Sequence, residues 1–320
     1  MFPECVKCIV NQAEQLLQRN SVDKDQANEV VLDLLRFMAG GEDEAKAAPA
    51  LPAYMNNLLN DRFRIDTALK NECRLINDHL LHLEEIIRDD ISGSTRPAQK
   101  ALQYSLAGNS IMNYLNPLDV TEDALKTAAA QMPVIDDSDR LFAQVKNART
   151  VLFIGDKAGE TVTDKLLMEQ LRHPRMYYAV RQKGVLYEAT VDDAYQAGID
   201  KVARVIGIPG DIKSFSEVPE DTEAGKIYRE ADVIVSKGEH NFWRLHQEGK
   251  RDIFFLVSVN CQVVSKLLHV RKGRTVVMHQ EQYRQRTAAR EKRSAPKHRS
   301  NDAVQRQTTC TQNVFPGPRF

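Results

Sequence analysis

The sequence has 320 residues, of which 42% are hydrophobic, 28% are charged and five are cysteines. This composition excludes a collagen-like, a disulfide-stapled and a wholly disordered protein, and the length suffices for one large domain or two smaller ones. Lysine plus arginine and aspartate plus glutamate both total 44, so no strong net field would draw the whole chain to a nucleic acid or a membrane.

The start of the chain, MFPECVKCIVNQ, lacks the basic and then apolar order of a signal peptide. No window approaches the run of roughly 18 apolar residues that a membrane-spanning helix requires. We therefore expect a cytoplasmic protein without a membrane partner, whose cysteines are free thiols.

Residues 1–148 have the pattern of helices almost throughout, and we expect no strand among them. The clearest helix covers 61–91, where apolar side chains recur at helical spacing with charges between them. Thr121 stands where a helix N-cap belongs. A loop is expected at 40–52, which begins with two glycines.

After residue 149 the pattern changes to short apolar runs that alternate with helical segments. Six such runs follow one another along the chain, at 150–155, 176–180, 203–207, 232–236, 253–257 and 275–278. Continuous apolar strands between helices are typical of a parallel sheet covered on both faces. The predicted fold class is therefore α/β, with a helical N-terminal region at 1–148 and a mostly parallel sheet at 149–279.

The remaining residues, 280–320, form a polar and basic third region. Between Arg271 and Arg306 the chain carries eleven basic residues against three acidic ones, and large apolar side chains are scarce. Such a segment cannot offset the entropy cost of ordering, so we predict a disordered basic tail. A nucleic-acid-binding arm is the alternative, which we disfavour because no aromatic interleaving supports base stacking.

Polar residues follow several of the predicted strands, at the edge where an open parallel sheet binds its ligands. They include Asp156, Lys157, Gly159, Glu160, Glu188, Lys237, Gly238 and Asn241. Carboxylates near lysines and glycine turns suit a divalent cation together with a phosphate. Ordinary loop residues and helix caps would give the same composition, and spacing alone does not decide between these readings.

Six segments resemble, in the same order, the signatures of the damage-control phosphatase family, also called the ARMT-like metal-binding domain. The string GDKAGETVTDKLL is similar to GDNAGE-(I/V)-x-x-D-(K/R)-L-L, and YEATVDDA is similar to NDAT-x-x-DA. ADVIVSKGEHNF is similar to ADL(I/V)ISKG-x-x-N-F, FFLVSVNC to FFLLK-x-KC, and AGNSIMNYLNP to GN-x-ID-x-G-x-NP. The opening PECVKCIVNQA resembles a microbial subgroup with an N-terminal CxxC, so the resemblance spans roughly residues 1–277.

The resemblance implies a helical region packed on a Rossmann-like sheet, and hydrolysis of phosphate monoesters of small metabolites, such as sugar phosphates or damaged phospho-metabolites. It also implies a divalent cation, Mn²⁺, Mg²⁺, Co²⁺ or Ni²⁺, as the cofactor and a small phosphorylated metabolite as the partner. The metal positions of the family fall at Asp156, Lys157 and Glu188. The catalytic residues implied are Asp156, Lys237 and Asn241, and the substrate-binding residues are Lys157, Gly159, Glu160 and Gly238.

Two of the three metal positions depart from the pattern of the family. Lys157 replaces an asparagine carbonyl with an ammonium that repels a cation, and Glu188 replaces an aspartate. Two lysines of the FFLLK-x-KC segment are replaced by Ser258 and Asn260. The sequence leaves two functions open, a metal-dependent phosphatase and a catalytically weakened relative that binds a phosphorylated ligand, with Lys157 where the cation would lie. Carboxyl methyltransferase activity, described for some members of the family, is a third alternative.

Overall fold

The structure, a computed structural model, describes residues 3–40, 44–111, 120–209, 212, 215–249 and 251–294. Met1–Arg284 forms one compact unit and Gln285–Phe320 a second. The described part of the second unit is the end of a helix, α13 (Gln280–Ser294), so the region predicted as a tail begins with helical structure. Residues 295–320, the rest of the predicted disordered tail, lie outside the described residues.

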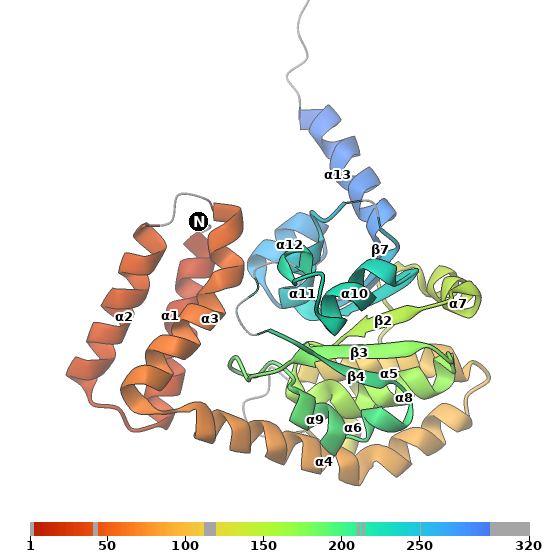
Figure 1. The fold of residues 1–320 in the computed structure, drawn as a ribbon, viewed down its shortest axis with the longest axis horizontal. Coiled ribbons are helices and arrows are strands. Elements are labelled where there is room, and N and C mark those ends of the chain that lie inside the picture. The colour runs from red at the N-terminus through yellow and green to blue at the C-terminus, as the bar shows by residue number, and fades with distance from the viewer. Residues whose placement is uncertain are drawn as a thin grey trace, which may run out of the picture. The chain divides into compact units, whose positions relative to one another are not determined.

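Three helices at the start of the chain pack on one another around their own apolar core (Figure 1). They are α1 (Pro3–Arg19), α2 (Lys24–Ala39) and α3 (Glu44–Phe63). Leu17, Leu34 and Met55 lie in this core with almost no exposed surface. The loop predicted at 40–52 is wrong from residue 44 onwards, because the segment EAKAA consists of strong helix formers and begins α3.

The helix predicted over 61–91 is interrupted near its start. α3 ends at Phe63, Arg64 adopts a left-handed φ of 54°, and α4 then runs over Asp66–Ser92. Three further helices precede the strand β2 (Val151–Ile154), namely α5 (Pro97–Ile111), α6 (Glu122–Ala129) and α7 (Ser138–Asn147). Thr121 is confirmed as the N-cap of α6, since its hydroxyl accepts a hydrogen bond of 3.2 Å from the N–H of Ala124.

Seven strands form one sheet in the order β1-β7-β6-β5-β2-β3-β4. They are β1 (Ile135–Asp136), β2 (Val151–Ile154), β3 (Met176–Arg181), β4 (Arg204–Ile208), β5 (Val233–Lys237), β6 (Ile253–Ser258) and β7 (Thr275–His279). All neighbouring strands are parallel except β6 and β7. The mostly parallel α/β fold is therefore confirmed. The expectation of no strand before residue 149 misses β1, which is too short to show a periodic pattern.

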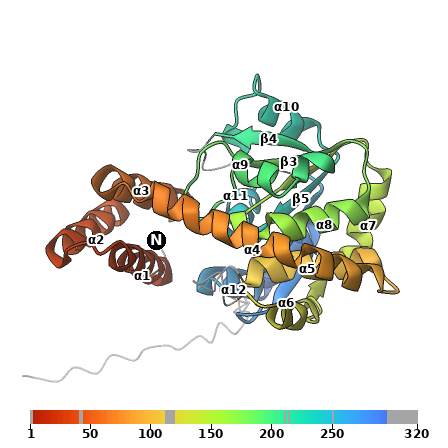
Figure 2. The same cartoon turned by 90° about the horizontal axis from the view of Figure 1, so that it is seen from below.

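Helices cover both faces of the sheet, as Figures 1 and 2 show. Phe153 and Tyr178 point to the face covered by α4 to α7, α8 (Thr161–Leu171) and α9 (Val191–Gln196). Ile154 and Phe255 point to the opposite face, which is covered by α10 (Glu223–Glu230), α11 (Gly238–Leu245) and α12 (Gln262–Leu268). Because both faces are covered, every residue of β2, β5, β6 and β7 is buried, which explains the continuous apolar runs.

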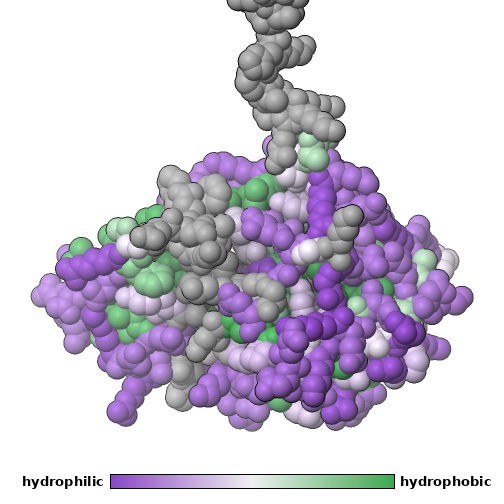
Figure 3. Space-filling view, turned by 45° about the horizontal axis from the view of Figure 1, so that its top comes forward, coloured by the Kyte–Doolittle hydropathy of each residue, from purple (hydrophilic) through white to green (hydrophobic). Residues whose placement is uncertain are grey.

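The outside of the molecule is polar over the face seen in Figure 3, where apolar residues form scattered patches. Within the described ranges, none of the helices combines the length and the apolar content needed to cross a bilayer.

The order of the strands reverses beside β2. β3 and β4 follow β2 on one side of it, whereas β5 and β6, which come later in the chain, lie on its other side. In open α/β sheets, ligands bind beyond the carboxyl ends of the strands at such a reversal. The chain leaves the two strands that flank the reversal at Gly155 and Lys237.

Candidate functional site

The loop after β3 returns to the end of β2 and brings Glu188 beside Asp156. The N–H of Ala158 donates to the carbonyl of Tyr187 at 2.9 Å, and the N–H of Ala189 donates to the carbonyl of Asp156 at 2.8 Å. Lys157 and Glu188 form a short antiparallel bridge between these segments. The three metal positions implied by the family resemblance, Asp156, Lys157 and Glu188, therefore lie next to one another.

The N-terminal helices hold the same loop from its other side. The N–H of Leu186 donates to the side-chain oxygen of Asn56, on α3, at 3.0 Å. The hydroxyl of Tyr187 donates to a carboxylate oxygen of Glu72, on α4, at 3.1 Å. Both anchors lie within two residues of Glu188.

Gly238 lets the backbone at the start of α11 approach the Asp156 carboxylate. Its φ is 77°, and a Cβ atom at this position would lie 1.8 Å from Oδ2 of Asp156. Glycine alone combines this left-handed conformation with the required space. The predicted site residue Gly238 is thus a contact between β5, α11 and the end of β2.

A recess with a free volume of about 10 Å³, about enough for one water molecule, lies at the carboxyl ends of β2, β3 and β4 beside α11. Its polar lining consists of Asp156, Arg181, Glu188, Asn241 and Arg244, and its apolar lining includes Val180, Ile208 and Phe215. The structure therefore brings Asp156, Glu188 and Asn241 together, as their positions after the strands predict. Lys237 does not line this recess.

Two buried arginines hold the carboxylate of Glu188. Nε of Arg181 donates to Oε2 at 2.6 Å, and Nη2 of Arg244 donates to Oε1 at 2.8 Å. Burial acts to raise the pKa of Glu188, but the two guanidinium groups outweigh it and lower the pKa to about 2. Glu188 is therefore ionised at neutral pH, and both of its oxygens are engaged.

Asn241 ties the ends of two strands together. Its side-chain NH₂ donates to the carbonyl of Gly155 at 2.9 Å and to the carbonyl of Lys237 at 3.0 Å. Its Oδ1 accepts a hydrogen bond of 3.3 Å from Arg244. Asn241 thus fixes the backbone on both sides of the strand reversal.

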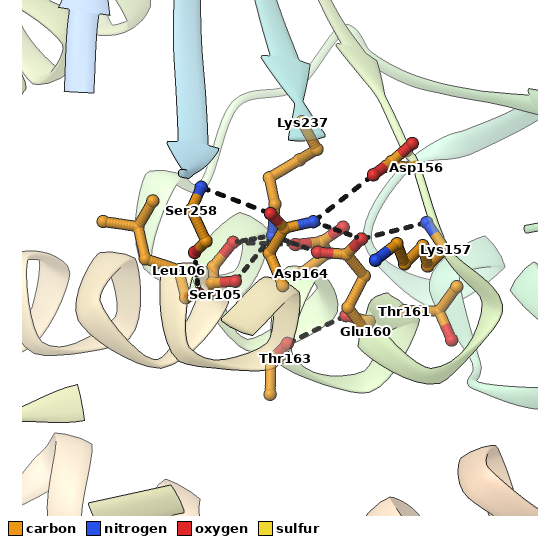
Figure 4. Close-up of polar contacts among 12 residues, drawn as sticks. Ser105, Leu106, Asp156, Lys157, Glu160, Thr161, Thr163, Asp164, Lys237 and Ser258 are labelled. Atoms are coloured by element: carbon orange, nitrogen blue, oxygen red, sulfur yellow. Dashed lines mark hydrogen bonds and ion pairs between the residues drawn. The ribbon is translucent and has the colours of Figure 1, made fainter. Parts of the chain in front are cut away.

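The ammonium of Lys237 lies in a separate buried network (Figure 4). It donates to the carbonyl and hydroxyl of Ser105 at 2.6 and 2.8 Å, and it pairs with Asp164 at 2.7 Å and Glu160 at 2.8 Å. Burial acts to lower the pKa of Lys237, but the two carboxylates outweigh it and raise the pKa. We call Ser105, Asn109, Glu160, Asp164 and Lys237 the lysine network.

Asn109, a residue of the AGNSIMNYLNP segment without a predicted role, connects this network to Asp156. Its side-chain NH₂ donates to Oδ2 of Asp156 at 3.3 Å and to Oε1 of Glu160 at 3.0 Å. The same oxygen of Glu160 accepts a hydrogen bond of 2.9 Å from the N–H of Lys157. Glu160 and the neighbouring Gly159, both buried in the short 3-10 turn Ala158–Glu160, therefore belong to the support of the site and do not line the recess.

One oxygen of Asp156 has no hydrogen-bond partner within the described ranges. This atom, Oδ1, is buried and lies 3.5 Å from Nδ1 of His240, which likewise lacks a hydrogen-bond partner there. Burial acts to raise the pKa of Asp156, but His240 and Lys157 outweigh it and lower the pKa. An ionised oxygen that accepts no hydrogen bond is suited to an additional positive group.

The family resemblance implies a divalent cation, which needs oxygen or nitrogen lone pairs. Lys157 offers no lone pair, and the oxygens of Glu188 are taken by arginines, whereas Oδ1 of Asp156 is available. The part of the chain that the structure describes contains no group of three or more His, Cys, Asp or Glu side chains suited to a metal. The segment 112–119, within the GN-x-ID-x-G-x-NP match, lies outside the described residues. Of the three family positions, Asp156 fits a cation.

Neither arginine has a predicted role, although the sequence contains a signal for both. Arg244 follows Asn241 by three residues on α11, so helical spacing places both on one face. Arg181 is the last residue of β3, at the edge where ligands bind. What neither position reveals is their common partner, Glu188, which reaches them through the fold of the loop after β3.

Comparison with known proteins agrees with the resemblance of the motifs. Residues 1–276 match the family described as Damage-control phosphatase ARMT1-like domain. A damage-control phosphatase of Pyrococcus horikoshii is 28% identical over 289 residues, which are 86% of this chain and 96% of that protein. A damage-control phosphatase of Archaeoglobus fulgidus is 24% identical over 282 residues, 85% of this chain and 96% of that protein. The crystal structure of a DUF89 family protein from Pyrococcus horikoshii aligns with a TM-score of 0.71 at 25% identity, over 88% of this chain and 99% of that one.

Proposed function

Because the chain belongs to the damage-control phosphatase ARMT1-like family, we propose that it hydrolyses phosphate monoesters of small metabolites at the recess beside the carboxyl ends of β2, β3 and β4. One observation carries the proposal. A buried carboxylate oxygen of Asp156, which accepts no hydrogen bond from the described residues, lies in the same recess as the guanidinium groups of Arg181 and Arg244. The carboxylate suits a divalent cation, and guanidinium groups suit the phosphoryl oxygens of an ester.

Arg244 has a hydrogen-bond donor that could bind a phosphoryl oxygen. The two terminal nitrogens of Arg244 bond Asn241 and Glu188, whereas its Nε is buried and makes no hydrogen bond to the described part of the chain. A phosphoryl oxygen bound here would satisfy this donor. Lys157, half-buried beside Asp156, adds positive charge for the ester.

We assign Asp156 as the residue that holds a divalent cation, Mn²⁺, Mg²⁺, Co²⁺ or Ni²⁺, through Oδ1. Such a cation, when bound, polarises the phosphoryl group and lowers the pKa of a water molecule. Asn241 and Lys237 are positioning residues in this proposal, because Asn241 fixes the two strand ends and the ammonium of Lys237 is enclosed by Glu160 and Asp164.

A second candidate function is the binding of a phosphorylated ligand without hydrolysis. It is favoured by the pairing of both Glu188 oxygens with arginines, which leaves one of the three family positions open to a cation. In that alternative, Lys157 provides the positive charge beside Asp156, and the recess keeps its affinity for a phosphoryl group.

Hydrolysis of p-nitrophenyl phosphate tests the proposal. Protein treated with a chelator is refilled separately with Mn²⁺, Mg²⁺, Co²⁺ and Ni²⁺, and the release of phosphate is measured. We expect activity only after refilling, and a loss of about 100-fold in kcat/KM for Asp156→Asn. Asp192→Asn is the matched control, because its side chain is 73% exposed and pairs with Lys70 away from the recess.

Two results would separate the candidates. Turnover with any of the four cations, abolished in Asp156→Asn and kept in Asp192→Asn, supports the phosphatase. No turnover with any cation, together with calorimetric binding of inorganic phosphate to the untreated protein, would replace it by the ligand-binding alternative.

A further inference from the structure

We propose that His240 is a metal ligand of this chain and shares one divalent cation with Asp156. This inference rests on the proposed function, because it concerns the cation of the same site. His240 stands at one of the two unspecified positions of the SKG-x-x-N-F element, so the motif itself assigns it no role.

The first turn of α11 brings the imidazole to the carboxylate. The left-handed conformation of Gly238 starts this helix against Asp156, and His240 follows two residues later. Nδ1 of His240 then lies 3.5 Å from Oδ1 of Asp156, while the side chain of His240 remains 41% exposed. Neither atom has a hydrogen-bond partner among the residues that the structure describes. Buried polar atoms normally have a partner, so this pair is suited to a third group that contacts both.

The separation of the two atoms allows one cation to contact both. Two ligands held at about 2.1 Å from one ion lie about 3.4 Å apart at a tetrahedral angle and about 3.0 Å apart at a right angle. The observed 3.5 Å is a separation that one shared ion can bridge, and it is also that of a direct ion pair. Tetrahedral coordination with an imidazole ligand is typical of Zn²⁺, and Co²⁺ is its usual spectroscopic substitute, whereas Mg²⁺ requires octahedral oxygen ligands.

The imidazole of His240 also supplies a type of ligand that the family position at Lys157 lacks. A neutral imidazole supplies a lone pair without adding negative charge, which replaces what Lys157 cannot give. Two protein ligands leave the remaining coordination positions to water and to a phosphoryl oxygen.

The test is the binding of metal ions alone, measured by calorimetry and by the visible absorption of Co²⁺. It uses the full chain after chelator treatment, in a Cys5→Ser, Cys8→Ser background, because these two thiols would otherwise compete for Co²⁺ and Zn²⁺. We expect His240→Gln to weaken Co²⁺ and Zn²⁺ binding by roughly 10- to 100-fold and to reduce the intense absorption of tetrahedral Co²⁺. His82→Gln, which changes an exposed histidine on α4, is the matched control and should leave both readouts unchanged.

Each outcome decides one question. Equal Co²⁺ affinity and spectra in the His240→Gln and parent proteins would overturn the inference, and so would the absence of Co²⁺ binding to the parent, since the pair would then be an ion pair of protonated His240 with Asp156. If Co²⁺ binds through His240 and no ester is hydrolysed, the inference stands and the phosphatase proposal fails. If phosphate is released with Mn²⁺ while His240→Gln changes no binding, the phosphatase proposal stands and the inference fails.

Discussion

The lysine network and the recess are neighbours with opposite arrangements of charge. In the network, one ammonium, Lys237, lies between the carboxylates of Glu160 and Asp164. In the recess, one carboxylate, Glu188, lies between the guanidinium groups of Arg181 and Arg244. The network thus has an excess of negative charge and is closed to solvent, while the group around Glu188 has an excess of positive charge and borders the recess. An anion such as a phosphate ester is suited to the second and excluded from the first.

The pKa values show the same contrast. Burial beside Glu160 raises the pKa of Asp164 to about 6, although Lys237 opposes the shift. The arginines lower the pKa of Glu188 to about 2 against the effect of burial. The two carboxylates therefore differ by several pKa units. Asp164 shares the ammonium of Lys237 with Glu160, whereas Glu188 alone is bound by two guanidinium groups. Three substitutions test this contrast.

Removal of Lys237 should have the largest effect, because it leaves two carboxylates buried without a cation. We expect Lys237→Met to lower the free energy of unfolding by about 3–5 kcal/mol, measured by urea denaturation. Lys126→Met, which removes an exposed lysine from a helical pair with Glu122, is the control and should be unchanged within error. If Lys237→Met does not fold, the variant that also carries Glu160→Gln and Asp164→Asn should fold again. Equal stability of the two single lysine variants would contradict a closed network.

Glu188→Gln should have an intermediate effect that depends on pH. The folded pKa of about 2 lies below the ordinary value of 4.5, so the stability from this carboxylate is fully present above pH 4.5 and is lost as the pH falls towards 2. We expect the variant to be less stable by about 3 kcal/mol at pH 7, with the difference decreasing between pH 4.5 and 3. Urea unfolding at a series of pH values measures it. A difference that stays constant with pH would show that the arginines do not hold the ionised form.

Asp164→Asn should have the smallest effect at neutral pH, since it removes the excess negative charge and leaves Lys237 paired with Glu160. The raised folded pKa of Asp164 means that its contribution favours folding below pH 3.8 and declines as the pH rises to about 6. We expect the variant to lose about 3 kcal/mol of pH-dependent stability, and this pH dependence is opposite in sign to that of Glu188. The same unfolding series from pH 4 to 7 tests it, and a wild-type slope in the variant would contradict the assignment.

The sequence predicts the sheet better than it predicts the partners of the charged residues. The runs at 150–155 and 232–236 match β2 and β5 within one residue, because strands buried on both faces are apolar throughout. The gathering of Asp156, Glu188 and Asn241 also follows from the sequence, because the carboxyl ends of parallel strands meet at one edge.

The position of the Lys237 ammonium, which lies in the lysine network and not in the recess, could not be predicted in the same way. Its ammonium is enclosed by Ser105 of α5 and Asp164 of α8, and it is the packing of these helices against the sheet that brings them together. The same holds for the two arginines around Glu188, which meet through tertiary contacts alone. Spacing indicates which strand end a residue follows, but not which opposite charge it meets there.

The two hydrogen bonds that anchor the loop after β3 limit which parts of this chain recombination could separate. Leu186 and Tyr187 are fastened to Asn56 and Glu72, so the helices at the start of the chain fix a segment that carries part of the recess. A gene fusion that replaced these helices, or a truncation that removed them, would leave the loop without its hydrogen bonds to Asn56 and Glu72. The N-terminal helices and the sheet are thus not interchangeable modules, and we expect them to have evolved together as one unit.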